Sequence, residues 1–416
     1  MASSQNTPKK QIIILGGSYG GVSVAHQLLK HAIPDLPDNT SYEVVLISPS
    51  TQVMCRPACP RAMISDRMLP QEKLFVDIVK QFEQYPTGSF KFIHGIATKL
   101  DHQEHVVSIR RHEGTDEILH YYALVIATGA TSKSPLLGLS GDASELRARW
   151  ADFRKALPQA KSIVIGGGGP SGVETAGELG EYLNGRAGWF SSKLENPKVP
   201  ITVINARDTI LPQLRPKIGR QAEHLLAKVG VTVINNVKVQ SVIPDNVGLT
   251  IDQLTTPATI SLSSDQKLTA DLYIPAFGTT PNTSFVPQPL LASDGRVKTN
   301  ATTLRVDDAG PFVYALGDVS NAARPAIHNI LSQIPVLAAN IKRDLLLNSS
   351  AKSRAAAQDA NFKEDTRETQ LVPIGTKKGV GAMMGYQAPS WAVWLIKGRD
   401  YWLWTTGRLW SGKQWN

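Results

Sequence analysis

The stretch from residue 11 to residue 21 reads Gln-Ile-Ile-Ile-Leu-Gly-Gly-Ser-Tyr-Gly-Gly, and it decides the fold. Its apolar half is typical of a buried parallel strand, and its glycines indicate a sharp turn into a helix. A second copy begins at Ser162-Ile163-Val164-Ile165 and continues to Gly167-Gly168-Gly169-Pro170-Ser171-Gly172. Such units bind dinucleotides, because the turn lets a pyrophosphate approach the backbone and the helix N-terminus offers free N–H groups. Two units predict two dinucleotides.

Working outward, apolar runs predict parallel strands at residues 12–15, 44–47, 122–127, 231–234, 272–275 and 313–316, with helices near 21–30 and 327–347. We therefore expect an α/β fold with two Rossmann-like domains. The first is split, covering residues 1–135 and 290–347, and the second, residues 136–289, is inserted into it. A short C-terminal region covers residues 348–416. Within it, residues 349–369 are polar and Ala-rich, which predicts a flexible connection or an exposed helix.

Composition limits the class of protein. The chain has 416 residues, 42% of them hydrophobic and 19% charged, which is typical of soluble α/β material. Its two cysteines, Cys55 and Cys59, fit a reducing compartment better than a disulfide scaffold. The N-terminus lacks an apolar signal region, Ala2 excludes myristoylation, and no run reaches the ~18 apolar residues of a membrane span. We expect a cytoplasmic protein or one peripheral on an intracellular membrane.

The C-terminal residues combine charge with aromatic rings. The net charge is +9, and residues 371–416 hold six of the eight tryptophans. The same segment has one acid and six basic residues: Lys377, Lys378, Lys397, Arg399, Arg408 and Lys413. This mixture favours peripheral membrane contact through residues 391–416. The alternative is a packed subdomain or dimer contact with tryptophan in its core. Nucleic acid is an unlikely partner, because no known binding module is visible.

Five motifs occur in a fixed order: the turn at 16–21, Ala127-Thr128-Gly129, the turn at 167–172 with Glu174, Gly278 with Pro281-Asn282, and Gly317-Asp318. In this order the chain resembles two-dinucleotide flavoproteins of the AIF-like (AMID or ferroptosis-suppressor) and type II NADH:quinone oxidoreductase type. The resemblance implies FAD in the split domain and NAD(P)H in the inserted one. It also implies hydride transfer from NAD(P)H to the flavin and on to an acceptor, with a quinone as the leading candidate. Two alternatives stay open: an FAD-dependent enzyme acting on a small-molecule metabolite in a biosynthetic pathway, and a non-catalytic, apoptosis-associated signalling or binding flavoprotein.

The FAD site is expected in the split domain, with two departures from the usual pattern. Ser18 stands at the second-glycine position, and Ser48 stands where an acid usually binds the adenosine ribose. By the resemblance, Asp318 accepts a hydrogen bond from the ribityl chain, although a helix N-cap would also explain an Asp there. The full set of expected FAD-site residues is Gly16, Gly17, Ser18, Gly20, Gly21, Ser48, Arg56, Ala127, Thr128, Gly129, Gly317 and Asp318.

The NAD(P)H site is expected at Gly167, Gly169 and Gly172, with Gly278 contributing from a later turn. Its ribose-reading strand ends without an acid and is followed by Arg207, which favours a 2′-phosphate and thus NADPH. The alternative is a solvated surface arginine. By the resemblance, Glu174 borders the nicotinamide and is the candidate catalytic residue, although a first-turn acid also suits the helix dipole.

Two further residue groups have less definite readings. Cys55 and Cys59 are either small apolar residues beside the flavin or a dithiol pair, and the sequence leaves both open. No metal site is expected, because His102 and His105 form an isolated pair.

Overall fold

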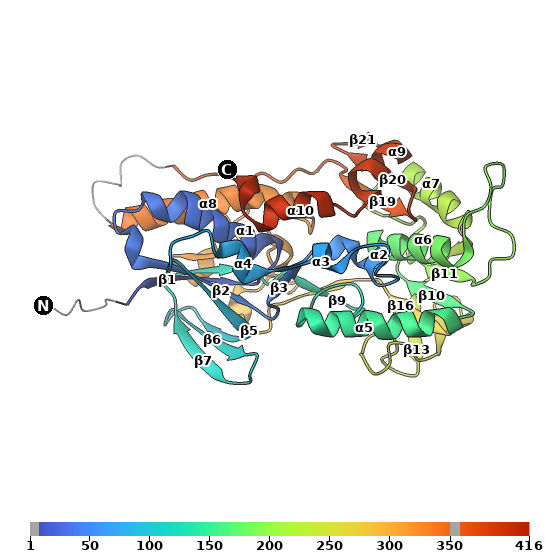
Figure 1. Ribbon diagram of the computed structural model, residues 1–416, viewed down its shortest axis with the longest axis horizontal. Coiled ribbons are helices and arrows are strands. Elements are labelled where there is room, and N and C mark those ends of the chain that lie inside the picture. Colours follow the sequence, from blue (N-terminus) through green and yellow to red (C-terminus); the bar gives the residue numbers. More distant parts are fainter. Residues whose placement is uncertain (1–7, 350–357, 416) are drawn as a thin grey trace, which may run out of the picture.

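The computed structural model describes residues 8–349 and 358–415, in which two parallel sheets form two dinucleotide-binding units (Figure 1). The larger sheet has the strand order β18-β8-β1-β2-β5-β6-β7. Its parallel strands are β1 (Lys10–Leu15), β2 (Tyr42–Ser48), β5 (Phe90–Asp101), β8 (Ala123–Ile126) and β18 (Val313–Ala315). The antiparallel strands β6 (Val106–Arg111) and β7 (Asp116–His120) extend it at one edge. Since β18 lies at the opposite edge from late in the chain, the expected split of this unit is present.

Helix α1 (Tyr19–Gln27) begins within the first glycine motif, two residues earlier than expected. It continues as a π-helical turn over Leu28–Ala32. Val22, Val24 and Ala25 are fully buried, because the long helix α8 (Ile327–Ser349) also packs against α1. The two helices lie side by side over the sheet in Figure 1. The expected α/β class is confirmed.

The second unit has the strand order β12-β11-β10-β16, all parallel. Its strands are β10 (Ile163–Gly166), β11 (Ile201–Ile204), β12 (Val231–Ile234) and β16 (Leu272–Pro275), flanked by the helices α5 (Ala143–Ala156), α6 (Pro170–Asn184) and α7 (Pro216–Ala227). Between β12 and β16 the chain forms a separate antiparallel sheet of β13 (Val239–Ile243), β14 (Ala258–Leu262) and β15 (Lys267–Ala270). Outside both sheets, β9 (Ala130–Ser132) pairs with β17 (Thr279–Pro281) and joins the units. The boundaries at residues 136 and 290 stay predictions.

The two units build their glycine turns in the same way. The Gly16 N–H donates to the Ile47 carbonyl at 2.8 Å, and the Gly167 N–H donates to the Ile204 carbonyl at 2.8 Å. The φ angles of Gly16 and Gly167 are +111° and +127°, a region that favours glycine. A Cβ at either position would fall within 2.5 Å of a backbone oxygen of the residue that follows the neighbouring strand. Both turns therefore require glycine for two independent reasons.

The C-terminal region is a folded part of the molecule, which corrects the expectation of a tail. It contains β19 (Gln370–Ile374), β20 (Lys378–Met383), β21 (Tyr386–Gln387), α9 (Ser390–Val393) and α10 (Leu403–Trp410). The hairpin packs on α6, and α10 returns to α1, where Trp410 is fully buried. The alternative of a packed subdomain with tryptophan in its core is therefore correct for the part around Trp410 and Tyr401, which are buried. Trp391 and Trp404 are exposed.

Of the segment at 349–369, for which a flexible connection or an exposed helix was expected, Ser349 ends α8 and only residues 358–369 can otherwise be compared with the expectation. Residues 350–357 lie outside the described part of the chain. Residues 358–369 contain no helix and are tied to the first unit: Asp359 pairs with Arg305 at 2.8 Å, Arg324 pairs with Glu364 at 2.8 Å, and Phe362 is buried. The partners of this strap, Arg305 and Arg324, lie far from it in the sequence, so no local pattern predicts it.

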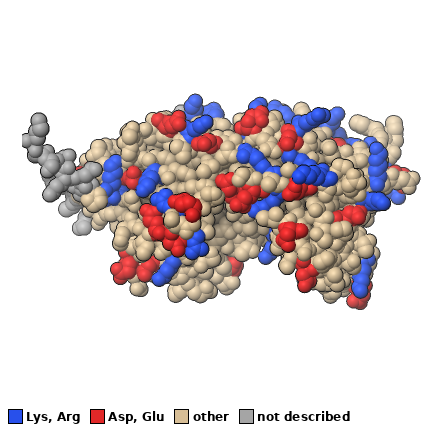
Figure 2. All heavy atoms as spheres, turned by 60° about the horizontal axis from the view of Figure 1, so that its bottom comes forward, with Lys and Arg blue, Asp and Glu red and all other residues tan. Residues whose placement is uncertain are grey.

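Two surface properties bear on the expected partners. Within the described residues, no helix combines the length and the apolar character needed to cross a membrane. On the face in Figure 2, basic and acidic side chains are interspersed and form no continuous basic stripe.

Candidate functional site

A cavity of about 400 Å³ lies between the two units, at the carboxyl ends of the first sheet's strands. The expected FAD-site residues that line it are Gly16, Gly17, Ser18, Gly20, Ser48, Arg56, Ala127, Thr128, Gly129, Gly317 and Asp318. Gly21 does not line it. A Cβ there would lie 1.8 Å from the Gly16 oxygen, so Gly21 serves the packing of α1 against the turn. Residues far apart in the sequence thus line one cavity large enough for a dinucleotide.

The strand-end residues have equivalent places in both units. A Cβ on Gly17 would lie 2.7 Å from the Ser48 hydroxyl oxygen, and one on Gly168 would lie 2.5 Å from the Asn205 amide oxygen. Ser48 and Asn205 are each 3% exposed. Each unit therefore has a neutral side chain where an acid commonly binds ribose.

Asp318 lies within the short 3₁₀ turn Gly317–Val319, well before α8 begins at Ile327. It is therefore not the N-cap of α8, which removes the alternative explanation. Burial raises the pKa of the Asp318 carboxyl, and the charges of Arg56 and Arg296 oppose this shift. The Arg56 guanidinium is fixed by hydrogen bonds to the Ala130 carbonyl at 2.8 Å and the Ser132 hydroxyl at 2.7 Å.

These features fit FAD. The glycine turn leaves room for a pyrophosphate at the N-terminus of α1, and Asp318 presents a half-buried acceptor to the same cavity. The first turn of α8 lines the cavity at Ile327 and Ile330, so its positive dipole end faces the space.

The second glycine turn, residues 167–172, is part of the inserted unit. Gly167, Gly169, Gly172, Arg207 and Gly278 do not line the first cavity, which the helix α6 reaches through Pro170, Ser171 and Glu174. A Cβ on Gly169 would meet no atom within 4 Å, so this position borders open space, as a pyrophosphate needs. A Cβ on Gly172 would lie 2.0 Å from the Gly167 oxygen, which matches the close packing of helix and strand.

Arg207 is exposed just beyond β11, and its backbone rather than its side chain organises the loop. The Asn205 amide N–H₂ donates to the Arg207 carbonyl at 3.0 Å and to the Asn235 side-chain oxygen at 2.7 Å. Both donors are used inward, so the Asn205 oxygen is the atom that faces Gly168. This end of β11 offers a neutral acceptor and a nearby cation.

Glu174 forms a buried ion pair that the sequence did not reveal. Its carboxylate accepts from the Nζ of Lys397, which also donates to the Leu371 carbonyl at 3.0 Å. Glu174 is 3% exposed and Lys397 is 6% exposed. Burial raises the pKa of Glu174 to about 7, and Lys397 opposes this shift without cancelling it. Lys397 is therefore not one of the membrane-facing cations expected in this segment. The only sequence signal of its burial is its place in the run Leu395-Ile396-Lys397-Gly398.

A second buried pair attaches the C-terminal region to α6. Arg61 donates to both oxygens of Glu178, at 2.9 and 2.7 Å, and to the Gly398 carbonyl at 2.8 Å. The Tyr401 hydroxyl also donates to Glu178, at 3.0 Å. Such bidentate, fully hydrogen-bonded pairing is what a buried charge requires.

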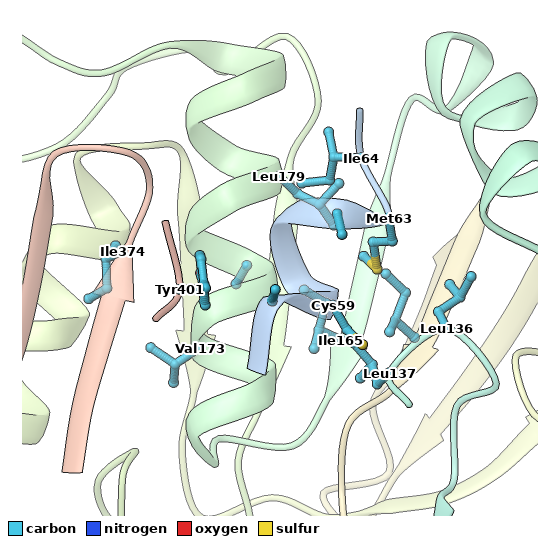
Figure 3. Close-up of a cluster of buried hydrophobic side chains, with 14 of the residues drawn as sticks. Cys59, Met63, Ile64, Leu136, Leu137, Ile165, Val173, Leu179, Ile374 and Tyr401 are labelled. Carbon is cyan, nitrogen blue, oxygen red and sulfur yellow. The ribbon is translucent and has the colours of Figure 1, made fainter. Parts of the chain in front are cut away.

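Cys55 and Cys59 are free and buried. Burial raises the pKa of Cys55 to about 11 and that of Cys59 to about 12, so both are thiols at neutral pH. The Tyr19 hydroxyl donates to the Cys55 sulfur at 3.3 Å, and this thiol donates to the Tyr401 carbonyl at 3.3 Å. Figure 3 shows Cys59 among apolar side chains next to α6. This environment favours the reading as small apolar residues over a reactive dithiol.

A second cavity, of about 440 Å³, adjoins the first. The residues that line both are Tyr19, Pro170, Pro325, Ala326, Ile327 and Lys397. Its other walls are mainly apolar, with Leu331, Leu371, Met383, Ile396 and Trp402 among them. The described residues contain no group of three or more His, Cys, Asp or Glu side chains placed to hold a metal.

Two dinucleotide-binding units that meet at a shared cavity define a two-dinucleotide redox protein. The sequence profile described as "Pyridine nucleotide-disulphide oxidoreductase" matches residues 10–340, so the chain belongs to this family. It is an FAD-dependent NAD(P)H oxidoreductase with FAD and NAD(P)H as cofactors, which confirms the expected class of enzyme.

Among its relatives, "Oxidoreductase phnG" of Penicillium herquei is 59% identical over 100% of this chain and 99% of its own length. Human "Ferroptosis suppressor protein 1" is 24% identical over 94% of this chain and 92% of its own, which confirms the resemblance drawn from the motifs. The solved sulfide:quinone oxidoreductase of Aquifex aeolicus has the same fold, with a TM-score of 0.68, 16% identity, and coverage of 97% of this chain and 92% of that one.

Proposed function

We propose that the protein oxidises NAD(P)H and delivers the reducing equivalents to a quinone bound in the second cavity. The observation that carries this proposal is the junction of the two cavities at Tyr19 and Lys397. A flat aromatic ring fits the apolar walls of the second cavity. The Aquifex aeolicus protein of the same fold is named a sulfide:quinone oxidoreductase, which supports a quinone as the acceptor.

The chain's own residues hold the reactants and supply protons. FAD, when bound, supplies the two-electron chemistry. The turn at Gly16 and the N-terminus of α1 would hold its pyrophosphate, and Asp318 would accept from a ribityl hydroxyl. Lys397 lines both cavities, and we propose that its Nζ donates a proton to a quinone oxygen. Glu174, with a pKa near 7, can return a proton to that nitrogen.

The test is anaerobic mixing of the purified yellow protein with NADPH or NADH, then with menadione as a soluble quinone. We expect bleaching of the flavin by either nicotinamide and recovery of its colour on adding menadione. A protein that is bleached but not reoxidised by quinones would contradict the proposed acceptor.

The proton path has its own test. Glu174→Gln should lower kcat more than tenfold and remove an inflection near pH 7 from the pH profile. Glu117→Gln, at an ion pair on β7, is the matched control and should leave the profile unchanged. An unchanged inflection in Glu174→Gln would exclude this pair as the proton source.

A second candidate acceptor, a polar small-molecule metabolite, is favoured by His328, Asn329 and Gln370, which line the second cavity. Comparing kcat/KM for a lipid-tailed benzoquinone and for hydroxylated naphthoquinones separates the two candidates. A strong preference for the lipid-tailed compound would exclude the polar metabolite.

We also propose that the exposed part of the C-terminal region contacts a membrane surface, which would place the protein peripherally on an intracellular membrane rather than free in the cytoplasm. Trp391, Leu395 and Trp404 are 68%, 45% and 58% exposed, and they support this contact. Trp410 and Lys397 are buried and cannot take part. Trp391→Ser with Trp404→Ser should weaken sedimentation with anionic vesicles, and unchanged sedimentation would refute the contact.

A further inference from the structure

The most exposed large apolar side chains of the described residues belong to the inserted unit, and they line neither cavity. Trp189 is 86% exposed and Phe190 is 101% exposed. They are adjacent on the loop that connects α6 to β11, residues 185–200, here called the arm. In Figure 1 the arm projects at the end of the molecule occupied by the inserted unit. Neither cavity includes any residue of the arm.

The arm is held at its base by hydrogen bonds. The Ala187 N–H donates to the Lys228 carbonyl at 2.8 Å, and the Leu194 N–H donates to the Ala227 carbonyl at 2.9 Å. Asn184 closes the base, since its side chain donates to the Val199 carbonyl at 3.0 Å and accepts from the Val199 N–H at 2.8 Å. The Lys228 Nζ also donates to the Trp189 carbonyl at 3.3 Å. The base of the arm is therefore ordered by hydrogen bonds, yet its tip exposes two aromatic rings to water. Exposed apolar groups of this kind mark a surface that binds a partner or a membrane.

The surroundings of the arm are basic. Lys193 and Lys198 are exposed on it, and Glu195 is its one acid. Lys193 approaches Glu195 at 3.4 Å. At the base, Arg186 pairs with Glu181 at 2.7 Å and donates to the Ile374 carbonyl at 2.7 Å. Ile374 ends β19, and the exposed cations Lys377 and Lys378 lie at the end of the following turn and at the start of β20.

We propose that the arm is a membrane contact in which Trp189 and Phe190 enter the interface of an anionic bilayer. Tryptophan and phenylalanine partition into this interface, and lysines beside them attract anionic headgroups. Phe190 is fully exposed, so no described part of its own chain covers it. A lipid interface accepts such a tip without a matching pocket, whereas a protein partner would have to supply one. The contact belongs to the inserted unit and is independent of the acceptor's identity.

The experiment is sedimentation of the full-length, flavin-loaded protein with vesicles of phosphatidylcholine alone or with phosphatidylserine, at low and high salt. We expect binding to anionic vesicles that salt weakens, and a loss of roughly tenfold in partitioning for Trp189→Ser with Phe190→Ser. Ile118→Ser, which removes another exposed apolar side chain on β7, is the matched control and should bind as the unmodified protein does. All variants should keep their flavin and their NAD(P)H:menadione activity.

Quenching by brominated lipids gives a second readout, because it should diminish when Trp189 alone is replaced by Ser. The proposal is overturned if the unmodified protein stays in the supernatant with anionic vesicles at low salt. It is also overturned if the double variant binds like the unmodified protein, and loss of binding in Trp391→Ser alone would then place the contact on the C-terminal region. An oligomer that is lost in the double variant, without vesicle binding, would instead make the arm an interface between copies of this chain.

Discussion

At the scale of single residues, Asp318 offers the sharpest test of the FAD site. Replacing Asp318 with Ala removes a half-buried carboxyl acceptor from the cavity wall. We expect FAD retention to weaken roughly 10- to 100-fold, since a hydrogen bond to a charged group contributes about 1.5–3 kcal/mol. Dialysis against increasing urea, followed by measurement of bound flavin, checks this. Asp308→Ala, on the surface, is the control, and equal flavin loss in both variants would contradict the assignment.

Gly169 separates the two cofactor sites. The Cβ of Gly169→Val would meet no protein atom within 4 Å, so the side chain begins in open space at the second turn. We expect flavin reduction by NADH and NADPH to fall at least roughly a hundredfold, because the side chain occupies the pyrophosphate's path. The flavin content should be unchanged. Stopped-flow absorbance measures both, and loss of FAD would show that the two turns have been assigned wrongly.

Arg207 tests the choice between the two nicotinamides. We expect Arg207→Ala to lower the ratio of kcat/KM for NADPH over NADH roughly tenfold, because a cation beside a neutral Asn205 favours a 2′-phosphate. Arg220→Ala, exposed on α7, is the control. If the ratio stays the same in Arg207→Ala, this side chain is an ordinary solvated arginine.

Local pattern explains which residues could be identified beforehand. The glycine turns and Gly317-Asp318 carry their constraints in adjacent residues, so the sequence predicts a large part of the first cavity's wall. Lys397 was missed because its partner Glu174 lies on another element, and burial of a lysine depends on that partner. Arg61 was missed for the same reason, since Glu178 and Gly398 come from two distant segments.

At the scale of secondary structure elements, the contact of α1 with α10 should make stability depend on pH. His26 of α1 lies 2.7 Å from the Trp410 carbonyl and 2.7 Å from the Tyr85 hydroxyl. Burial lowers the pKa of His26 to about 4, from 6.5. Below pH 6.5 the unfolded chain therefore takes up a proton that the folded chain refuses. The free energy of unfolding should fall by up to about 3 kcal/mol as the pH drops from 6.5 to 4.

Melting temperatures between pH 7.5 and 4 check this expectation. His26→Gln should have a lower melting temperature at pH 7.5 but a flatter profile below pH 6.5. His120→Gln, on an exposed histidine of β7, should keep the profile of the unmodified protein. A profile that is equally steep in His26→Gln would locate the pH dependence elsewhere.

The elements that could be predicted are those with a strong local period. Strands β12 and β16 have the expected bounds, and α8 begins where it was expected, because each is a continuous or periodic apolar segment. The strap at 358–369 and the short pair of β9 and β17 depend on partners distant in the sequence. No local period distinguishes them from ordinary loops.

At the scale of the whole molecule, the C-terminal region completes the fold. Deleting residues 391–416 would remove Trp410, whose ring packs against Tyr19 at 4.8 Å, and would leave Glu174 without Lys397. We expect this truncation to yield aggregated or flavin-free protein. Circular dichroism and flavin absorbance after purification check this. A soluble, yellow truncated protein would contradict the expectation and show that residues 391–416 are a tail that the rest of the fold does not need.

The return of α10 to α1 also sets an order of events during synthesis. Helix α1 leaves the ribosome early, but α8 and α10, which cover it, are among the last segments to emerge. Until then the nascent chain exposes an apolar helix next to the first glycine turn. The flavin therefore cannot be enclosed until translation has ended, and chaperones that protect apolar segments have most of the synthesis time in which to act.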